Sequence, residues 1–244
     1  MRRIVWKLVI VLLSHKTTFL WSENFLADEI LLKMAEIPGW CSRDKALLMM
    51  NIIKENRCQI SVEIGVFAGK SLFPIAEALR YNGVGLVFGI DAWNSYEALQ
   101  GFNFSDPNYE WWSQIDFDDL YQKTIELIDK HTLKEFSCLL RKSAQNALHL
   151  FLDETIDFIH FDGNHNEEYV FQDIESYFPK VKDGGYILLN DPNWASMKRS
   201  LVFLLERTEV ISPFTRDVQY LLFRKNKQRI ENAKQLFKND FNRK

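Results

Sequence analysis

The sequence is poor in cysteine and has no paired cysteine motif. Its three cysteines, Cys41, Cys58 and Cys138, lie far apart and form no C-x-x-C pair. An odd, scattered set argues against a disulfide framework or a zinc site and favours a reducing compartment. We therefore expect a cytoplasmic protein in which Cys58 and Cys138 serve as small core side chains.

The sequence also lacks an excess of basic residues. The formal net charge of the 244 residues is -3, and 47% of the residues are hydrophobic, as in a folded domain. Basic residues are scarce outside a C-terminal tail at residues 225–244, so we expect no nucleic-acid partner. The tail itself favours a solvated helix, with an acidic partner or a membrane surface as the alternative.

A membrane-spanning run is missing as well. Residues 4–13 are apolar apart from Lys7, and this stretch is too short to cross a bilayer. The basic residues before it resemble the start of a signal peptide, but no clean small-residue cleavage site follows. We expect residues 1–40 to form an accessory segment with an amphipathic helix at 22–37, followed by one domain at 41–224.

The strongest local pattern is an apolar strand that runs into two glycines. Residues 59–64 predict a buried parallel strand, Gly65 and Gly69 a tight turn, and residues 72–80 a helix. The glycine spacing matches neither the G-x-G-x-x-G fingerprint nor a P-loop. A junction of this kind offers free backbone N–H groups and the positive end of a helix, so it can hold a polar or anionic ligand.

A second predicted strand, at residues 85–91, ends in Asp91. A strand, a helix and a second strand that ends in a carboxylate form the arrangement that binds the hydroxyl groups of a ribose. Glu63 ends the first strand beside the turn, where it could meet a cationic or hydroxylated part of the same ligand.

Polar side chains also follow two later strands. A predicted strand from residue 156 ends in Asp162, and another at 186–189 ends in Asn190 and Asp191. Together their oxygens suit a hard divalent cation such as Mg²⁺, Mn²⁺ or Ca²⁺ at one edge of a parallel sheet. Each acidic residue taken alone also suits a loop cap.

Three further polar residues lie near the predicted strand ends. His165 follows a strand end and could act as a base or a ligand, whereas mid-strand His160 is expected in the core or behind the site. Ser143 follows a predicted strand at 136–140, where it could cap the next helix or bond to a ligand base.

The segment at 92–117 is rich in aromatic side chains. It predicts either a cap helix packed by aromatics or a lid beside the strand ends, where open α/β sheets place their ligands.

The rest of the chain completes an alternating series of strands and helices. It predicts helices at 43–56 with Ser42 as N-cap, 118–131, 167–177 and 197–206, a turn at 179–185, and an antiparallel edge pair at 210–211 and 218–223.

Taken in order, these segments resemble the class I S-adenosylmethionine-dependent methyltransferases. The motif V-E-I-G-V-x-x-G-x-S matches residues 62–71, and the motif D-F-I-H-x-D-G-x-H matches residues 157–165. Gly184 and Gly185, with the strand after them, are similar as well. The resemblance covers about residues 40–224. It implies an α/β fold: a Rossmann-like, doubly wound, mostly parallel seven-stranded sheet with an antiparallel last strand.

The resemblance also implies roles for single residues. It assigns the methionine and ribose side of S-adenosylmethionine to Glu63, Gly65, Gly69 and Ser71, the ribose hydroxyls to Asp91, and the adenine side to Ser143. Related sugar and small-molecule O-methyltransferases often carry a divalent ion at positions matching Asp162, Asn190 and Asp191. In many of them position 190 is acidic, so Asn190 should bind a metal more weakly.

The predicted function is O-methylation of a small hydroxylated molecule. A metal on Asp162 and Asp191 would lower the pKa of a bound hydroxyl, and His165 or Asp162 would take its proton. The alternatives are a metal-free methyltransferase, a nucleotide-binding oxidoreductase and a non-catalytic protein on the same fold. The partners expected are the small-molecule acceptor and, as an option, further copies of the chain, with no membrane.

Overall fold

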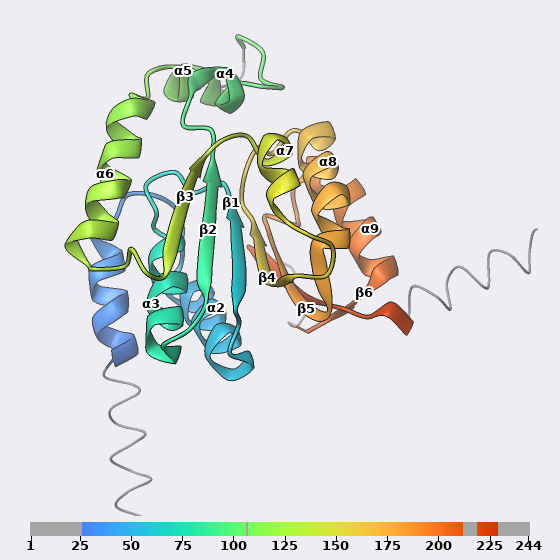
Figure 1. Ribbon diagram of the computed structural model, residues 1–244. Coiled ribbons are helices and arrows are strands. Elements are labelled where there is room, and N and C mark those ends of the chain that lie inside the picture. Colours follow the sequence, from blue (N-terminus) through green and yellow to red (C-terminus); the bar gives the residue numbers. More distant parts are fainter. Residues whose placement is uncertain (1–25, 106, 212–218, 229–244) are drawn as a thin grey trace, which may run out of the picture.

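The computed structural model describes residues 26–105, 107–211 and 219–228. At its centre is a seven-stranded sheet in the order β3-β2-β1-β4-β5-β7-β6 (Figure 1). The strands are β1 (Ile60–Ile64), β2 (Leu86–Asp91), β3 (Ser137–Arg141), β4 (Ile156–Phe161), β5 (Val181–Asn190), β6 (Thr208–Val210) and β7 (Tyr220–Lys225).

The direction of the strands matches the sequence-based prediction. Strands β1 to β5 pair in parallel, and β7 runs antiparallel to both β5 and β6. The predicted mostly parallel sheet with an antiparallel last strand is therefore confirmed. Because β1 lies between β2 and β4, the strand order reverses there, and ligands of such sheets bind at the carboxyl ends beside this point.

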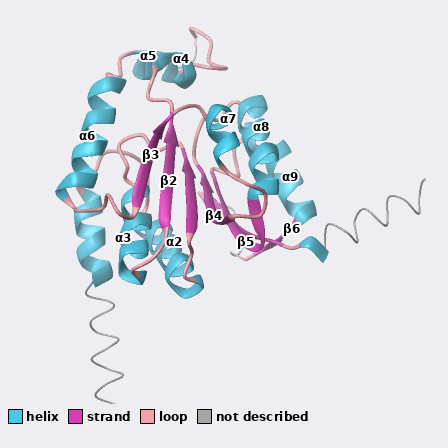
Figure 2. Ribbon diagram, in the orientation of Figure 1, coloured by secondary structure: helices cyan, strands magenta, loops and turns pink. Residues whose placement is uncertain are grey.

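Helices cover both faces of the sheet (Figure 2). One core cluster joins the sheet to a helix at residues 26–35 and to two long helices, and a second cluster lies on the other face. The first face carries α2 (Arg43–Asn56) and α3 (Leu72–Asn82), with α6 (Phe117–Lys130) beside them; the second carries α7 (Ala144–Ala147), α8 (Glu167–Tyr177) and α9 (Lys198–Arg207).

Two local signals explain where α2 begins and ends. The side chain of Ser42 accepts a hydrogen bond from the backbone N–H of Lys45, which satisfies one free donor of the first turn, as predicted. Arg57 adopts a left-handed conformation after the last turn, and its N–H bonds back to helix carbonyls. The start of α2, and with it Lys45, is thus fixed relative to the strand ends.

One predicted turn is wrong. Residues 179–185 were expected to form a turn before a short strand, but β5 already begins at Val181. The register of β5 against β4 shifts between Ile156, which pairs with Val181, and Phe158, which pairs with Tyr186. Gly184, with a φ of +76°, lies within this shift. The glycines therefore form a bulge in a continuous strand, since glycine adopts such backbone angles readily.

Two further expectations concern the ends of the chain. The apolar stretch at residues 4–13 and the tail from residue 229 onward lie outside the described residues. The start of the predicted tail belongs to the sheet: Lys225 ends β7 and donates hydrogen bonds to the carbonyl oxygens of Phe178 (3.0 Å) and Val181 (2.6 Å). Among the described helices, none combines the length and the apolar character that a membrane crossing requires.

Candidate active site

The turn after β1 is shaped by its glycines. Gly65 has a φ of +87°, and a Cβ at this position would lie 2.1 Å from the backbone oxygen of Asp162. No side chain fits into so close an approach between the ends of β1 and β4. Gly69, with a φ of +85°, donates its N–H to the carbonyl oxygen of Val66 at 2.9 Å. Both glycines take left-handed backbone angles that other residues adopt at a cost.

Asp91 connects the end of β2 to this turn. Its Oδ2 accepts hydrogen bonds from the backbone N–H groups of Val66 (3.0 Å) and Phe67 (2.9 Å), and its Oδ1 accepts one from Trp93 (2.8 Å). Burial raises the pKa of Asp91, while these three backbone donors act in the opposite direction. A carboxylate has about four acceptor positions, so a ligand hydroxyl can still bond to Oδ1.

A cavity of about 580 Å³ opens beside the end of β2. Its lining is mostly polar and includes Ala92, Asn94, Arg141 and Ser143. Ser143 is the N-cap residue of α7, but its side chain makes no capping hydrogen bond. The residue predicted for the adenine side thus lines a cavity next to the residue predicted for the ribose hydroxyls.

Glu63 lies inside the sheet. Its side chain is 0% exposed, and its Oε1 lies 3.0 Å from Nδ1 of His160, which is equally buried. Burial raises the pKa of Glu63 to about 8, against an opposing effect of Ser71, so the carboxyl group is protonated at neutral pH. Burial and the charge of Lys45 lower the pKa of His160. The two side chains form a buried neutral pair next to the glycine turn, and Glu63 is not among the residues that line the cavity.

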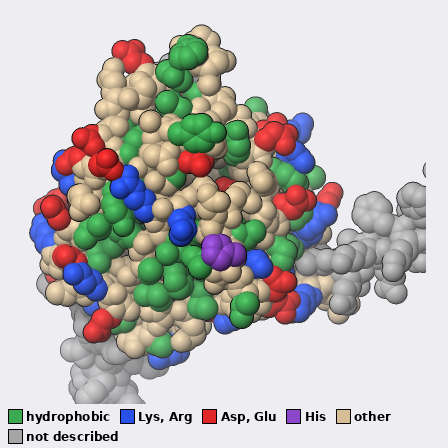
Figure 3. Space-filling view, turned by 45° about the horizontal axis from the view of Figure 1, so that its top comes forward, with side chains coloured by type: hydrophobic (Ala, Val, Ile, Leu, Met, Phe, Trp, Pro, Cys, Tyr) green, Lys and Arg blue, Asp and Glu red, His purple; other side chains and the backbone are tan. Residues whose placement is uncertain are grey.

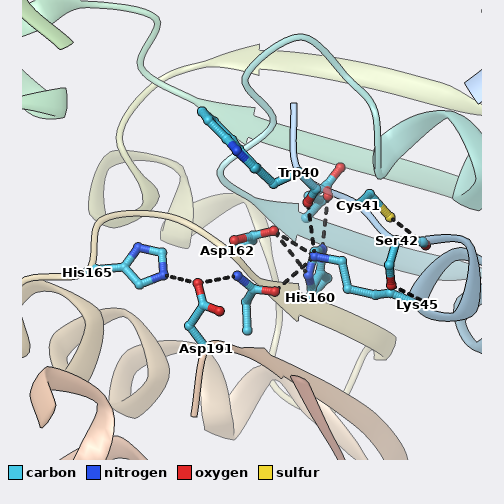
Figure 4. Close-up of polar contacts among 10 residues, drawn as sticks. Trp40, Cys41, Ser42, Lys45, His160, Asp162, His165 and Asp191 are labelled. Atoms are coloured by element: carbon cyan, nitrogen blue, oxygen red, sulfur yellow. Dashed lines mark hydrogen bonds and ion pairs between the residues drawn. The ribbon is translucent and has the colours of Figure 1, made fainter. Parts of the chain in front are cut away.

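Asp162, Asn190 and Asp191 meet at one edge, as predicted, but Lys45 lies among them (Figure 4). The Lys45 ammonium donates hydrogen bonds to Asp162 Oδ2 at 3.0 Å, Asn190 Oδ1 at 2.9 Å and the carbonyl oxygen of Trp40 at 3.4 Å. Burial is the largest single effect and lowers the pKa of Lys45, but the charge and the hydrogen bond of Asp162, together with smaller effects of neighbouring groups, raise it on balance. The ammonium therefore stays charged.

Asp191 is turned away from Lys45 and toward His165. Its Oδ2 accepts a hydrogen bond from Asn190 Nδ2 at 2.9 Å and lies 3.1 Å from His165 Nε2. The His165 ring packs on Trp194 at 4.8 Å and keeps 24% of its side chain exposed. When the Nε2–H group of His165 donates a hydrogen bond to Asp191, Nδ1 carries a lone pair that can accept a proton.

This arrangement does not fit the divalent metal that the resemblance implied. A hard cation needs several converging oxygens, yet Asp162 and Asn190 point their oxygens at Lys45, and Asp191 points at His165. A second cation beside the buried ammonium would be repelled. Across residues 26–105, 107–211 and 219–228, no group of three His, Cys, Asp or Glu side chains could hold a metal ion.

The sequence interpretation missed Lys45, although a signal was present. Lys45, Met49 and Ile53 recur every four residues of α2, and all three are buried. A lysine in line with core residues at helical spacing implies a partner inside the protein, because a buried charge is costly unless it is paired.

Aromatic rings stand above this edge. Two short helices, α4 (Ser95–Ala98) and α5 (Pro107–Ser113), cross the upper ends of the strands in Figure 1. Trp111 of α5 lies 5.5 Å from the ring of Trp40 and 6.0 Å from that of Phe67. Figure 3, which brings this end forward, shows hydrophobic side chains interspersed with acidic and basic ones. The segment at 92–117 thus reaches the glycine turn and the backbone that binds Lys45.

A family model described as a methyltransferase domain matches residues 62–192. The match covers more than half of the chain, and we conclude that the chain belongs to this family of methyltransferases. Its strand order and antiparallel last strand are those of the class I fold.

Solved structures share this fold. The SAH-bound methyltransferase PaMTH1 of Podospora anserina superimposes with a TM-score of 0.57 at 16% identity, over 82% of this chain and 87% of that one. An O-methyltransferase from Bacillus cereus, also in complex with SAH, gives 0.56 at 16% identity, over 82% and 90%. The O-methyltransferase NovP gives 0.58 at 16% identity, over 75% and 78%.

A curated relative is the uncharacterized protein y4gI of Sinorhizobium fredii. It is 25% identical over 131 residues, which are 53% of this chain but 13% of y4gI. The chain therefore spans a small part of that relative's length.

Proposed function

We propose that the chain transfers the methyl group of S-adenosylmethionine to a hydroxyl oxygen of a small acceptor. The arrangement of three features supports this proposal. Asp91 binds the glycine turn, a polar cavity opens at Ala92, the residue after Asp91, and a His165–Asp191 pair lies at the adjoining strand ends. Membership of a methyltransferase family and O-methyltransferase neighbours such as NovP support it.

When bound, S-adenosylmethionine supplies a methyl group that its positive sulfur already activates. The glycine turn and the free acceptor position of Asp91 would hold the ribose, and Ser143 would face the adenine. The acceptor hydroxyl would give its proton to Nδ1 of His165 while its oxygen forms the new O–C bond and the C–S bond breaks. Asp191 would hold the ring in the correct tautomer for this step.

Two measurements test the proposal on the full chain. Isothermal titration should show S-adenosylmethionine binding, and a panel of hydroxylated small molecules should yield S-adenosylhomocysteine with at least one member. His165→Gln should retain cofactor binding but lower turnover by about 100-fold or more. His131→Gln is the matched control, because His131 packs on Phe73 away from the strand ends. Absence of S-adenosylmethionine binding would contradict the proposal, and NADH binding in its place would favour an oxidoreductase.

A further inference from the structure

The polar edge at β4 and β5 already contains a cation. Lys45 Nζ lies within 3.4 Å of three oxygens, from Asp162, Asn190 and Trp40. An ammonium group has three N–H donors, so these acceptors can occupy all of them. Lys45 is 3% exposed and the Asp162 side chain 17%, so the contact is a largely buried ion pair rather than a flexible surface one.

The lysine also decides which way the Asn190 amide faces. An ammonium group can only donate, so it requires the amide oxygen on its own side. A carboxylate can only accept, so Asp191 requires the amide NH₂, which lies 2.9 Å from its Oδ2. Asn190 satisfies both neighbours at once. An aspartate here would offer no donor and would add a negative charge beside Asp191.

We infer, on the basis of the proposed methyl transfer, that the Lys45 ammonium takes the place of a divalent metal at this edge. Lys45 is a positioning residue. It fixes the Asn190 amide, the amide fixes Asp191, and Asp191 orients His165. Methyl transfer by this chain then needs no metal, and the acceptor proton goes to His165.

Mn²⁺ titration followed by electron paramagnetic resonance tests this inference on the full chain, since the signal of free Mn²⁺ falls as the ion binds. Five proteins are compared: the parent, Lys45→Ala, Lys45→Ala combined with Asn190→Asp, Lys45→Met, and Asp162→Asn. The methionine variant is the matched control, because it removes the charge but fills most of the space of the lysine side chain. S-adenosylmethionine binding is measured on the same metal-free samples.

The parent should bind no Mn²⁺ at this edge. Lys45→Ala leaves the oxygens of Asp162 and Asn190 without their cation and should bind one ion per chain. The double variant should bind Mn²⁺ about tenfold more tightly than Lys45→Ala, because a second carboxylate adds ligand charge. Lys45→Met should bind none. In both alanine-containing variants, Mn²⁺ should also raise the melting temperature, since it binds the folded state.

Two results would overturn the inference. The first is a parent chain that binds one Mn²⁺ and loses it on Asp162→Asn. The second is a folded Lys45→Ala protein that gains no affinity for Mn²⁺. If Lys45→Ala does not fold without metal, refolding with and without Mn²⁺ decides instead: recovery of the folded state supports the inference, and failure contradicts it. The Mn²⁺ and refolding readouts do not depend on S-adenosylmethionine, so failed cofactor binding by the metal-free parent tells separately against the proposed function.

Discussion

The two halves of the site hold their carboxylates in different ways. At the glycine turn, Asp91 is held by three backbone N–H groups. At the β4 and β5 ends, the Asp162 carboxylate accepts a hydrogen bond from a side chain, that of Lys45, and His160 Nε2 lies 3.6 Å from the same oxygen. Burial raises the pKa of both carboxyl groups.

This difference separates what the fold determines from what single residues determine. Only a proline substitution removes a backbone donor, so the Asp91 half should fail only when the turn or Asp91 itself changes. The Asp162 half depends on the side chain of Lys45, which a substitution can remove. It should therefore lose stability on that substitution and regain part of it when a second substitution removes the partner charge. The following predictions test this contrast in order of decreasing effect.

Gly65→Ala should break the backbone-held half most severely. A Cβ at Gly65 would meet the Asp162 carbonyl oxygen at 2.1 Å, and the φ of +87° adds strain. We expect a loss of more than about 4 kcal/mol in the free energy of unfolding, measured by urea denaturation. Gly83→Ala is the control: its φ is +66° but nothing lies within 4 Å, so the cost should be about 1–2 kcal/mol. Equal losses in the two variants would contradict the close approach.

Lys45→Met should break the side-chain-held half but allow its repair. Removing one partner of a buried ion pair leaves Asp162 uncompensated, at a cost of about 3 kcal/mol or more. Adding Asp162→Asn should recover part of this loss, and a double-mutant cycle by urea denaturation measures the coupling. Lys134→Met, which breaks an exposed pair with Asp129, should change stability little. If the effects of the two substitutions on the free energy of unfolding simply add, Lys45 and Asp162 do not stabilise each other.

Asp91→Asn should test the backbone-held carboxylate itself. The substitution keeps the shape but replaces one acceptor oxygen by an NH₂ group that faces backbone donors, at a cost of about 2 kcal/mol in stability. Affinity for S-adenosylmethionine, measured by isothermal titration, should fall about tenfold or more. Asp153→Asn should leave the affinity unchanged, because Asp153 precedes the amino end of β4, away from the carboxyl ends of the strands, and pairs with Lys180. Unaltered binding by Asp91→Asn would remove this residue from the cofactor site.

Glu63→Gln should change how the stability of the protein depends on pH, because it removes the titratable carboxyl group of the buried Glu63–His160 pair. Because burial raises the Glu63 pKa to about 8, from an ordinary value of 4.5, the folded state holds a proton that the unfolded state loses between these pH values. The contribution of this bound proton to the free energy of unfolding is fully present below about pH 4.5 and is lost as pH rises toward 8. Relative to Glu63→Gln, the parent should lose roughly 1 kcal/mol per pH unit across this window, measured by urea denaturation at each pH. If the free energies of unfolding of the parent and of Glu63→Gln change with pH in the same way, Glu63 is not protonated in the folded state.

The fold was largely predictable because its signals are local. The glycine turn, the Ser42 cap and the apolar strand runs each predict an element from neighbouring residues, and the structure has these elements. The predicted turn at 179–185 failed because a bulge and a turn use the same glycines. The difference between them lies in the pairing of β5 with β4, which is not local.

The site was predicted only in part for the same reason. The meeting of Asp162, Asn190 and Asp191 follows from parallel strands that end at one edge. Lys45 comes from α2, well over one hundred residues earlier in the chain, and its contact with Asp162 depends on how the helix packs. Without that packing, three oxygen donors favour a metal, since the helical spacing of Lys45 implies a buried partner but does not say which residue that partner is.

A cation carried on a side chain differs from a bound ion in one thermodynamic respect. The occupancy of an ion site follows mass action, so it varies with the concentration of the ion and with competing chelators. The Lys45 ammonium is covalently part of α2, and it reaches Asp162 and Asn190 whenever α2 packs on the sheet. The charge balance of this edge is therefore established by folding itself and does not vary with the metal content of the surroundings.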